Sequence, residues 1–240
     1  MKAFEEILAA RAAEAGIPLT AEQIGQFSVY HEMLLDWNTR MNLTALTAPE
    51  DVAVKHIIDS LMAYDAARFD GARTLIDVGT GAGLPGIPLA VYAPHLTVTL
   101  LDSLNKRVRF LMEVTAAMGL PNVRCIHARA EEAARTAEHR AAYDIAVSRA
   151  VARLPVLLEY ALPFVRIGGT LLALKGRAYA EEQKEARRAA EVLGGGRITA
   201  RPVRLPGLDD VRAMLTVTKE RQTPAAYPRG GGAPTRRPIV

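Results

Sequence analysis

The stretch Asp77-Val78-Gly79-Thr80-Gly81-Ala82-Gly83 decides the fold of this 240-residue chain. It follows a short apolar run and precedes a helical pattern, so it predicts a glycine turn at the carboxyl end of a parallel strand. Glycines at such a turn let the backbone approach a ligand closely. Because glycine turns between strand and helix also arise for steric reasons, the loop alone indicates only a nucleoside-cofactor crevice.

A carboxylate at the next strand end makes this prediction more specific. Asp102 ends that strand, where it can accept hydrogen bonds from both hydroxyls of a ribose, although a solvated strand-end carboxylate is the alternative. Gly83 comes one residue too early for the dinucleotide pattern Gly-x-Gly-x-x-Gly. The sequence also has no Tyr-x-x-x-Lys pair for hydride chemistry. Together with Asp77 before the first glycine, these features favour S-adenosyl-L-methionine over NAD and predict a methyltransferase.

From Arg73 onward, short apolar runs alternate with helical patterns, which is typical of an α/β fold with a mostly parallel sheet. The runs predict seven strands, at residues 73–78, 97–101, 122–126, 143–147, 169–174, 197–204 and 212–218. No long helix separates the last two strands, which indicates an antiparallel edge. We therefore expect a Rossmann-like class I methyltransferase fold with a seven-stranded, mostly parallel sheet and an α-helical N-terminal extension.

The pattern also predicts three segments. Residues 1–68 have apolar side chains at helical spacing and form the extension, in which Thr20 is an expected N-cap and Thr47-Ala48-Pro49-Glu50 fits a capping box. Residues 69–221 form the expected cofactor-binding domain. Residues 222–240, the C-terminal tail, are rich in Pro, Gly and Arg. Because the prolines at 224, 228, 234 and 238 exclude a helix or a central strand, we expect an extended arm or disorder there.

Composition limits the partners and the compartment. A net charge of +4 and a pI near 9.3, mostly from Arg, fit a polyanionic partner without requiring one. The single cysteine, Cys125, excludes an internal disulfide, and the spacing of the histidines gives no metal site. The chain has neither a signal-peptide pattern nor an apolar run long enough to span a bilayer. We expect a cytoplasmic monomer without membrane contact.

Two further strand ends carry charged residues that would share the crevice. Arg129-Ala130-Glu131 follows the third predicted strand, and Ser148-Arg149-Ala150 follows the fourth. Ligands bind outside the carboxyl ends of parallel strands, so both can face the cofactor. The alternatives are that Glu131 is a charge at a helix N-terminus and that Arg149 is a surface salt-bridge partner.

The acceptor is limited by what the sequence lacks. Methylation of a pyrimidine carbon needs an activated cysteine, yet Cys125 lies inside a predicted strand as a core thiol. Exocyclic amino methyltransferases carry Asn/Asp-Pro-Pro-aromatic after the fourth strand, where this chain has Ser-Arg-Ala-Val. An acceptor with a free lone pair, such as N7 of a purine, needs only positioning and desolvation. We therefore assign no general base.

With these motifs the chain resembles the ribosomal RNA small subunit methyltransferase G family (RsmG), also called glucose-inhibited division protein B. The resemblance covers about 140 residues. It rests on Trp37-Asn38, Asn42-Leu43-Thr44, His56-Ile57-Ile58-Asp59-Ser60-Leu61, the string from Asp77 to Pro88, Leu101-Asp102-Ser103, Lys106-Arg107, Ser148-Arg149-Ala150 and Lys175-Gly176. Within that string, Gly-Leu-Pro-Gly-Ile-Pro is far more specific than the glycine loop.

The resemblance implies methylation of N7 of a guanosine in 16S ribosomal RNA, either naked or in a small-subunit particle. The expected cofactor-binding residues are Gly79, Gly81, Leu84, Asp102, Ser103, Ala130, Glu131 and Arg149. His56, Asp59 and Ser60 are candidates for the active-site rim, or else form a structural hydrogen-bond cluster. Trp37 is a core anchor or a stacking platform.

Three alternatives to this interpretation differ in ligand class. They are a small-molecule methyltransferase, an NAD-type oxidoreductase and a non-enzymatic RNA-binding module. The tail departs from the family pattern because the family commonly has a second Arg after Arg229 and a Lys-Lys pair where Arg236 and Arg237 stand.

Overall fold

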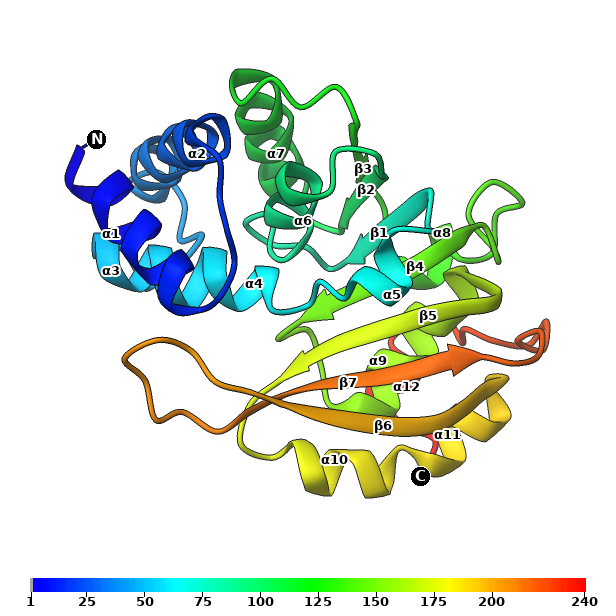
Figure 1. Cartoon of the computed structure of the whole chain (residues 1–240). Helices are drawn as coiled ribbons and strands as arrows, with labels where there is room; N and C mark the ends of the chain where they lie inside the picture. Colours follow the sequence, from blue (N-terminus) through cyan, green and yellow to red (C-terminus); the bar gives the residue numbers. More distant parts are fainter. Residues whose placement is uncertain (1) are drawn as a thin grey trace.

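A seven-stranded sheet forms the centre of the molecule in a computed structural model that describes residues 2–240 (Figure 1). The strand order is β3-β2-β1-β4-β5-β7-β6, and β7 runs antiparallel to both of its neighbours. The strands are β1 Thr74–Val78, β2 Thr97–Asp102, β3 Val123–His127, β4 Tyr143–Arg149, β5 Val165–Lys175, β6 Gly195–Val203 and β7 Arg212–Lys219. The predicted fold class is confirmed.

The sheet differs from the prediction in two details. The antiparallel strand β7 lies between β5 and β6, so β6 forms the edge. Pairing also extends β2 and β4 past their predicted ends, because Asp102 pairs with His127 and Arg149 pairs with Leu174. Asp102 and Arg149 are therefore the last residues of their strands and are held by the sheet.

Helices cover both faces of the sheet (Figure 1). Alternate strand residues point to opposite faces, so Leu75 joins the cluster under the N-terminal helices while Ile76 joins the cluster under α9. The helices before the sheet are α1 Lys2–Glu14, α2 Ala21–Asn38, α3 Pro49–Asp51, the π-helix η1 Val52–Ile58, α4 Asp59–Leu61 and α5 Ala66–Phe69. The later helices are α6 Gly86–Tyr92, α7 Asn105–Ala117, α8 Ala130–Ala133, α9 Leu154–Ala161, the 3₁₀ helix η2 Leu162–Phe164, α10 Tyr179–Glu185, α11 Arg187–Val192 and α12 Ala233–Arg236.

The two predicted helix starts have different outcomes. Thr20 caps α2 as expected, and its side chain and that of Gln23 form a complete capping box. At the second start the N-cap is Ala48, one residue after Thr47, and no side chain caps the helix. Pro49 begins this helix in the first turn, where its missing N–H removes no intrahelical bond.

The tail is neither extended nor free of helix. Residues 233–236 form α12, with Pro234 buried and in the first turn. The expectation that prolines exclude a helix was wrong, because proline is tolerated in the first turn. No helix in residues 2–240 is long and apolar enough to cross a bilayer.

Candidate functional site

The glycine loop curves away from the end of β1 and is held by the end of β2. The N–H groups of Gly79 and Thr80 both donate to the carbonyl of Leu101, at 2.9 and 3.1 Å. Gly81 has φ +61°, and a Cβ added there would meet no atom within 4 Å. Gly83 differs, because a Cβ there would lie 2.3 Å from Ile87 Cδ1. Gly81 therefore borders open space for a ligand, whereas Gly83 is needed for packing.

Asp77 holds this loop through hydrogen bonds to its buried carboxylate. It is fully buried, and its Oδ2 accepts hydrogen bonds from Thr80 Oγ1 (2.6 Å) and the N–H of Gly86 (2.7 Å). Burial raises the pKa of its carboxyl to about 7, against the effect of these two bonds. The residue that distinguished the loop in the sequence thus acts on loop geometry.

The N-terminal helices support the loop from the other side. Tyr30 of α2 is buried, and its hydroxyl donates to the carbonyl of Ala82 at 2.8 Å. The ring of Tyr30 also packs against Phe110 of α7. The extension is therefore part of the structure that fixes the glycine loop.

Two adjoining cavities contain all eight predicted cofactor residues. The loop cavity, about 400 Å³, is lined by Gly79, Gly81, Leu84, Asp102, Ser103 and Arg149. The nucleoside pocket, about 300 Å³, is lined by Gly79, Asp102, Ser103, Ala130 and Glu131. These residues are up to 70 positions apart in the sequence, and the ends of the strands place them close together in space.

Asp102 has the geometry expected of a ribose ligand. It is 3% exposed, with Oδ2 accepting from the N–H of Gly81 and Oδ1 accepting from the N–H of Leu104, both at 2.9 Å. Arg107 Nη1 lies 3.5 Å from Oδ2 as a third donor, and because an ionised carboxylate offers about four acceptor positions, Asp102 can still accept from a hydroxyl group. A polar group with spare acceptors at the border of a cavity fits the nucleoside of S-adenosylmethionine.

Glu131 combines both roles considered for it. It lies in the first turn of α8, where a carboxylate interacts favourably with the helix dipole, and it also lines the nucleoside pocket. Its side chain is buried, with Arg129 Nη1 4.0 Å from Oε1. The helix-terminus role therefore does not remove Glu131 from the pocket.

A third cavity, the basic cavity of about 490 Å³, opens beside the loop cavity. The two share His56, Arg149, Ala150 and Val151. The charged residues that line the basic cavity are Lys55, Arg149, Arg153, Lys175, Arg212, Asp59 and Glu182. Five of them are basic and two acidic, so this cavity suits an anionic ligand.

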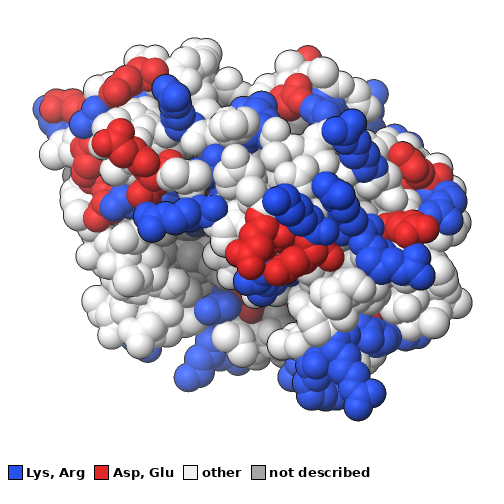
Figure 2. All heavy atoms as spheres, turned by 90° about the horizontal axis from the view of Figure 1, so that it is seen from below, with Lys and Arg blue, Asp and Glu red and all other residues white. Residues whose placement is uncertain are grey.

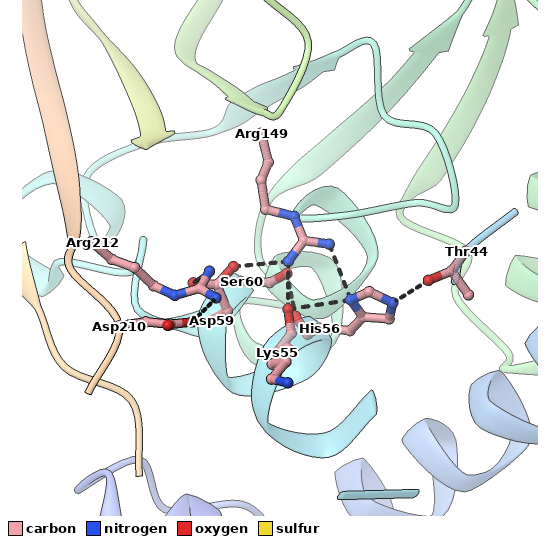
Figure 3. Close-up of polar contacts among 8 residues, drawn as sticks. All are labelled: Thr44, Lys55, His56, Asp59, Ser60, Arg149, Asp210 and Arg212. Atoms are coloured by element: carbon pink, nitrogen blue, oxygen red, sulfur yellow. Dashed lines mark hydrogen bonds and ion pairs between the residues drawn. The ribbon is translucent and has the colours of Figure 1, made fainter. Parts of the chain in front are cut away.

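Arg149 connects the sheet to the N-terminal helices inside these cavities (Figure 3). Its Nη1 donates to Asp59 Oδ2 at 2.9 Å and to the carbonyl of Lys55 at 2.8 Å. Arg212 donates from Nη1 to the other oxygen of Asp59 at 3.2 Å. Asp59 is 3% exposed, so this carboxylate joins two strand-end arginines in a nearly dry setting.

The helix that carries Asp59 is π-helical over Val52–Ile58. The N–H of Asp59 bonds to the carbonyls of Val54 and His56, whereas a regular α-helix would use Lys55. The carbonyl of Lys55 instead accepts from Arg149. π-helical turns are frequent at functional sites, and here the turn presents both a carbonyl and a carboxylate to Arg149.

His56 is buried and positioned by a loop that the sequence motifs mark. Asn38 Oδ1 accepts from the N–H groups of Leu43 and Thr44, at 2.8 and 3.0 Å, which fixes that loop. Thr44 Oγ1 then contacts His56 Nε2 at 2.9 Å. Burial lowers the pKa of His56 to about 4, and the charge of Arg149 adds to this effect. His56 is therefore a neutral imidazole near pH 7.

Two of the three candidates for the active-site rim line a cavity and the third does not. His56 and Asp59 line the basic cavity, but Ser60 is fully buried and its hydroxyl donates to the carbonyl of His56 at 2.6 Å. Ser60 thus belongs to the structural hydrogen-bond cluster. Trp37 is half-buried, with its ring edge-on to Phe110 at 5.8 Å between centroids, which is the geometry of a core anchor.

The segment after β4 lies over the glycine loop. Ala150 has φ +56°, which is unusual for a residue with a side chain and recurs at functional sites. The next residue, Val151, lines all three cavities, and its Cγ2 lies 2.6 Å from where a Cβ on Gly79 would be. Lys175 holds this segment through Glu182, since Glu182 Oε2 lies 2.8 Å from Lys175 Nζ and accepts from the N–H of Leu154.

Comparison with known proteins gives the family. A family model described as rRNA small subunit methyltransferase G, or GidB, matches residues 23–202. The chain belongs to this family. A relative named ribosomal RNA small subunit methyltransferase G from Alkaliphilus metalliredigens is 48% identical over 94% of this chain and 95% of its own. One of that name from Moorella thermoacetica is 43% identical over the whole of both chains.

A solved structure supports the fold. The S-adenosylmethionine-dependent methyltransferase SibL, in its apo form, aligns with a TM-score of 0.55 and 17% identity over 92% of this chain and 75% of that one. At this identity the likeness concerns the fold only. Membership of the rRNA small subunit methyltransferase G family rests on the sequence matches.

In this family member, the charged residues Lys55, Arg153, Lys175, Glu182 and Arg212 of the basic cavity were not predicted as site residues. Lys175 was quoted only as part of a motif, and Arg212 was placed only at the start of the last strand. Because β7 is antiparallel, its first residue lies at the same edge as the carboxyl ends of β4 and β5, and Ala213 pairs with Lys175. A basic residue at the start of an antiparallel strand was the available signal. Within residues 2–240 no three His, Cys, Asp or Glu side chains converge as a metal site.

Proposed function

We propose that this member of the rRNA small subunit methyltransferase G family transfers a methyl group from S-adenosyl-L-methionine to N7 of a guanosine in 16S ribosomal RNA. The observation that carries the proposal is that the loop cavity and the basic cavity share residues 149–151. The names of the curated relatives support ribosomal RNA as the substrate class.

The cofactor would be held by the residues of the loop cavity and the nucleoside pocket. Asp102 would accept the ribose hydroxyls, and Gly81 leaves the space that close approach to the loop requires. Glu131 and Ala130 also line the nucleoside pocket, where they would contact the base. When bound, S-adenosylmethionine supplies an electrophilic methyl group on a positively charged sulfonium.

Attack by a guanine N7 needs no proton to be removed, because this nitrogen carries a free lone pair. A new N–C bond forms as the S–C bond breaks, leaving S-adenosylhomocysteine and a cationic 7-methylguanine ring. The neutral imidazole of His56 fits this chemistry, since it adds no positive charge next to that ring. Positioning is then the main contribution of the protein, worth on the order of 7–11 kcal/mol in well-aligned reactions.

The basic cavity supports a nucleic-acid acceptor over an uncharged small molecule. Lys55 and Arg153 line it in addition to the two arginines on Asp59, and both remain partly exposed beside their acidic partners Asp51 and Glu185, so they can meet the phosphates that flank a target nucleotide. Figure 2 shows Lys and Arg side chains in several groups on the face seen from below, with acidic side chains clustered between them.

Two measurements test the proposal. Calorimetric titration should show binding of S-adenosylmethionine and none of NAD, and the reverse result would favour the oxidoreductase alternative. Mapping of 7-methylguanosine in 16S rRNA from cells with and without the gene should show one modified guanosine lost. Unmodified rRNA incubated with the protein and cofactor, as naked RNA and as small-subunit particles, should then regain the 7-methylguanosine.

We further propose that the protein acts in the cytoplasm as a monomer.

A further inference from the structure

The C-terminal tail packs on the same face of the sheet as α9. Tyr227 and Ile239 contact the hydrophobic cluster under α9, and α12 lies against α9 itself (Figure 1). Residues 222–240 therefore return to the domain after β7, which contrasts with the extended arm expected from their composition.

Two arginines from the segment between α8 and β4 hold the backbone of the tail. Arg140 donates to the carbonyls of Thr223 and Tyr227, at 2.8 and 3.0 Å. Arg135 donates to the carbonyl of Pro228 at 2.7 Å, and from the same nitrogen to that of Ala226 at 3.1 Å. Charge-assisted bonds of this kind are stronger than neutral ones, so the first half of the tail has a defined path.

A buried ion pair fixes the second half. Glu159 of α9 is fully buried, and its Oε1 accepts from the N–H and Nε of Arg229 at 2.7 and 2.9 Å, while Oε2 accepts from Nη2 at 2.6 Å. Arg229 Nη2 also donates to the carbonyl of Arg237 at 2.8 Å, which closes the turn that contains α12. Without the tail, Glu159 would lose these three hydrogen bonds and its cationic partner.

This path brings the tail to the nucleoside pocket. Gly232 and Thr235 line the pocket together with Asp102, Ala130 and Glu131. Tyr160 of α9 lines it as well, and its hydroxyl lies 3.3 Å from Thr235 Oγ1. The tail thus forms one side of the pocket, and the residues at the strand ends form the other side.

We propose that the C-terminal tail is a wall of the cofactor's nucleoside pocket, and that cofactor binding and docking of the tail stabilise each other. The inference rests on the proposed function, because the ligand is the nucleoside part of S-adenosylmethionine. By linkage, a ligand that touches the docked tail must favour docking by the same factor as docking favours the ligand. The exposed side chains of Arg236 and Arg237 remain available to RNA.

The test uses S-adenosylhomocysteine, the demethylated product, as the probe on the full chain. Thr235→Arg places a long side chain at an exposed position that borders the pocket. Ala226→Arg is the matched control, since it introduces the same side chain at an exposed tail residue outside the pocket lining. We expect Thr235→Arg to weaken calorimetric affinity by about tenfold or more, and the control to stay within about twofold of the native chain.

Trypsin gives an independent measure of docking. It cleaves after Arg229 only when the pair with Glu159 opens, and intact mass detects loss of residues 230–240. Saturating S-adenosylhomocysteine should slow this cleavage by roughly tenfold in the native chain. Glu159→Gln weakens the pair, so it should speed the cleavage and also lower the affinity for the probe.

The possible outcomes separate the two proposals. If the native chain fails to bind S-adenosylhomocysteine, the proposed function fails. If it binds, but Thr235→Arg binds as tightly as the control and the probe leaves cleavage after Arg229 unchanged, the tail proposal is wrong and the function stands.

Discussion

Alanine at two neighbouring glycines of the loop should separate an effect on cofactor binding from an effect on stability. Gly81 and Gly83 both have positive φ, at +61° and +89°, where a side chain costs about 1–2 kcal/mol. For Gly81→Ala this backbone cost is the whole effect on folding, because the new Cβ meets no atom within 4 Å. The Cβ instead enters the space where the cofactor would approach. We expect a loss of about 1–2 kcal/mol in unfolding free energy, and a large loss of cofactor affinity.

For Gly83→Ala the packing adds a second cost. Its Cβ would lie 2.3 Å from Ile87 Cδ1 and 3.1 Å from Leu111 Cδ2, so both side chains must move. Overpacking of this kind costs about 1–3 kcal/mol, which gives about 2–5 kcal/mol in total. Gly83→Ala should therefore be clearly the less stable variant.

Urea unfolding and calorimetry with S-adenosylhomocysteine measure the two effects. Unfolding midpoints at unchanged slope give the stability difference, and titration at a temperature where both variants are folded gives the affinity. Native-like affinity in Gly81→Ala would refute the placement of the cofactor over this glycine. Equal stability of the two variants would refute the separation of a ligand-facing glycine from a packing glycine.

Three further predictions concern charged residues. Asp102→Ala should weaken binding of S-adenosylhomocysteine by about 1.4 kcal/mol or more, that is about tenfold in calorimetry, and an unchanged affinity would remove Asp102 from the site. Asp59→Asn and Arg212→Met should each destabilise the protein, and urea unfolding of the double variant should show a coupling of about 0.5–2 kcal/mol, which is modest because Arg212 is partly exposed. Additive effects would show that this ion pair contributes nothing. Replacing Arg236 and Arg237 together by Ala should weaken RNA binding and lower its salt slope by about 1–2 without changing cofactor affinity, as measured by RNA titration at several salt concentrations.

The sequence predicted which residues gather around the loop cavity and the nucleoside pocket, because local spacing and strand order determine their positions. A glycine loop after one strand and an acidic residue at the end of the next lie side by side whenever the two strands pair in parallel. β1 and β2 do pair in this way, and the N–H of Gly81 reaches Asp102 as a result. The same reasoning placed Glu131 and Arg149 after strands that end at the same edge, although β2 and β1 separate β3 from β4 in the sheet.

The acceptor side was predicted less completely because it depends on long-range pairing. The positions of Asp59 and Arg149 are 90 residues apart, and nothing in either local pattern indicates that they bond. Helical spacing put His56, Asp59 and Ser60 on one face, but the π-helical turn directs Asp59 to Arg149 and leaves Ser60 inside the helix layer. The sequence indicated that the last two strands pair antiparallel, but not that β7 also pairs with β5, so Arg212 was missed.

The tail shows why composition is a weak guide to order. Its prolines and glycines suppress regular secondary structure, but order in residues 222–240 comes from Arg135, Arg140 and Glu159, which belong to other elements. Those three side chains satisfy backbone carbonyls and one arginine, so the tail needs few bonds of its own.

The site is built from both the N-terminal extension and the sheet, so a movement of the extension can change the cofactor cavity. Tyr30 supports the glycine loop, while His56 and Asp59 contact Arg149 at the junction of the two cavities. An RNA that displaces the helix carrying Asp59 would therefore also change the surroundings of Arg149, which lines the loop cavity. Because Asp59 is the carboxylate that holds both Arg149 and Arg212, the extension can couple acceptor binding to cofactor geometry without any contact between the RNA and the glycine loop.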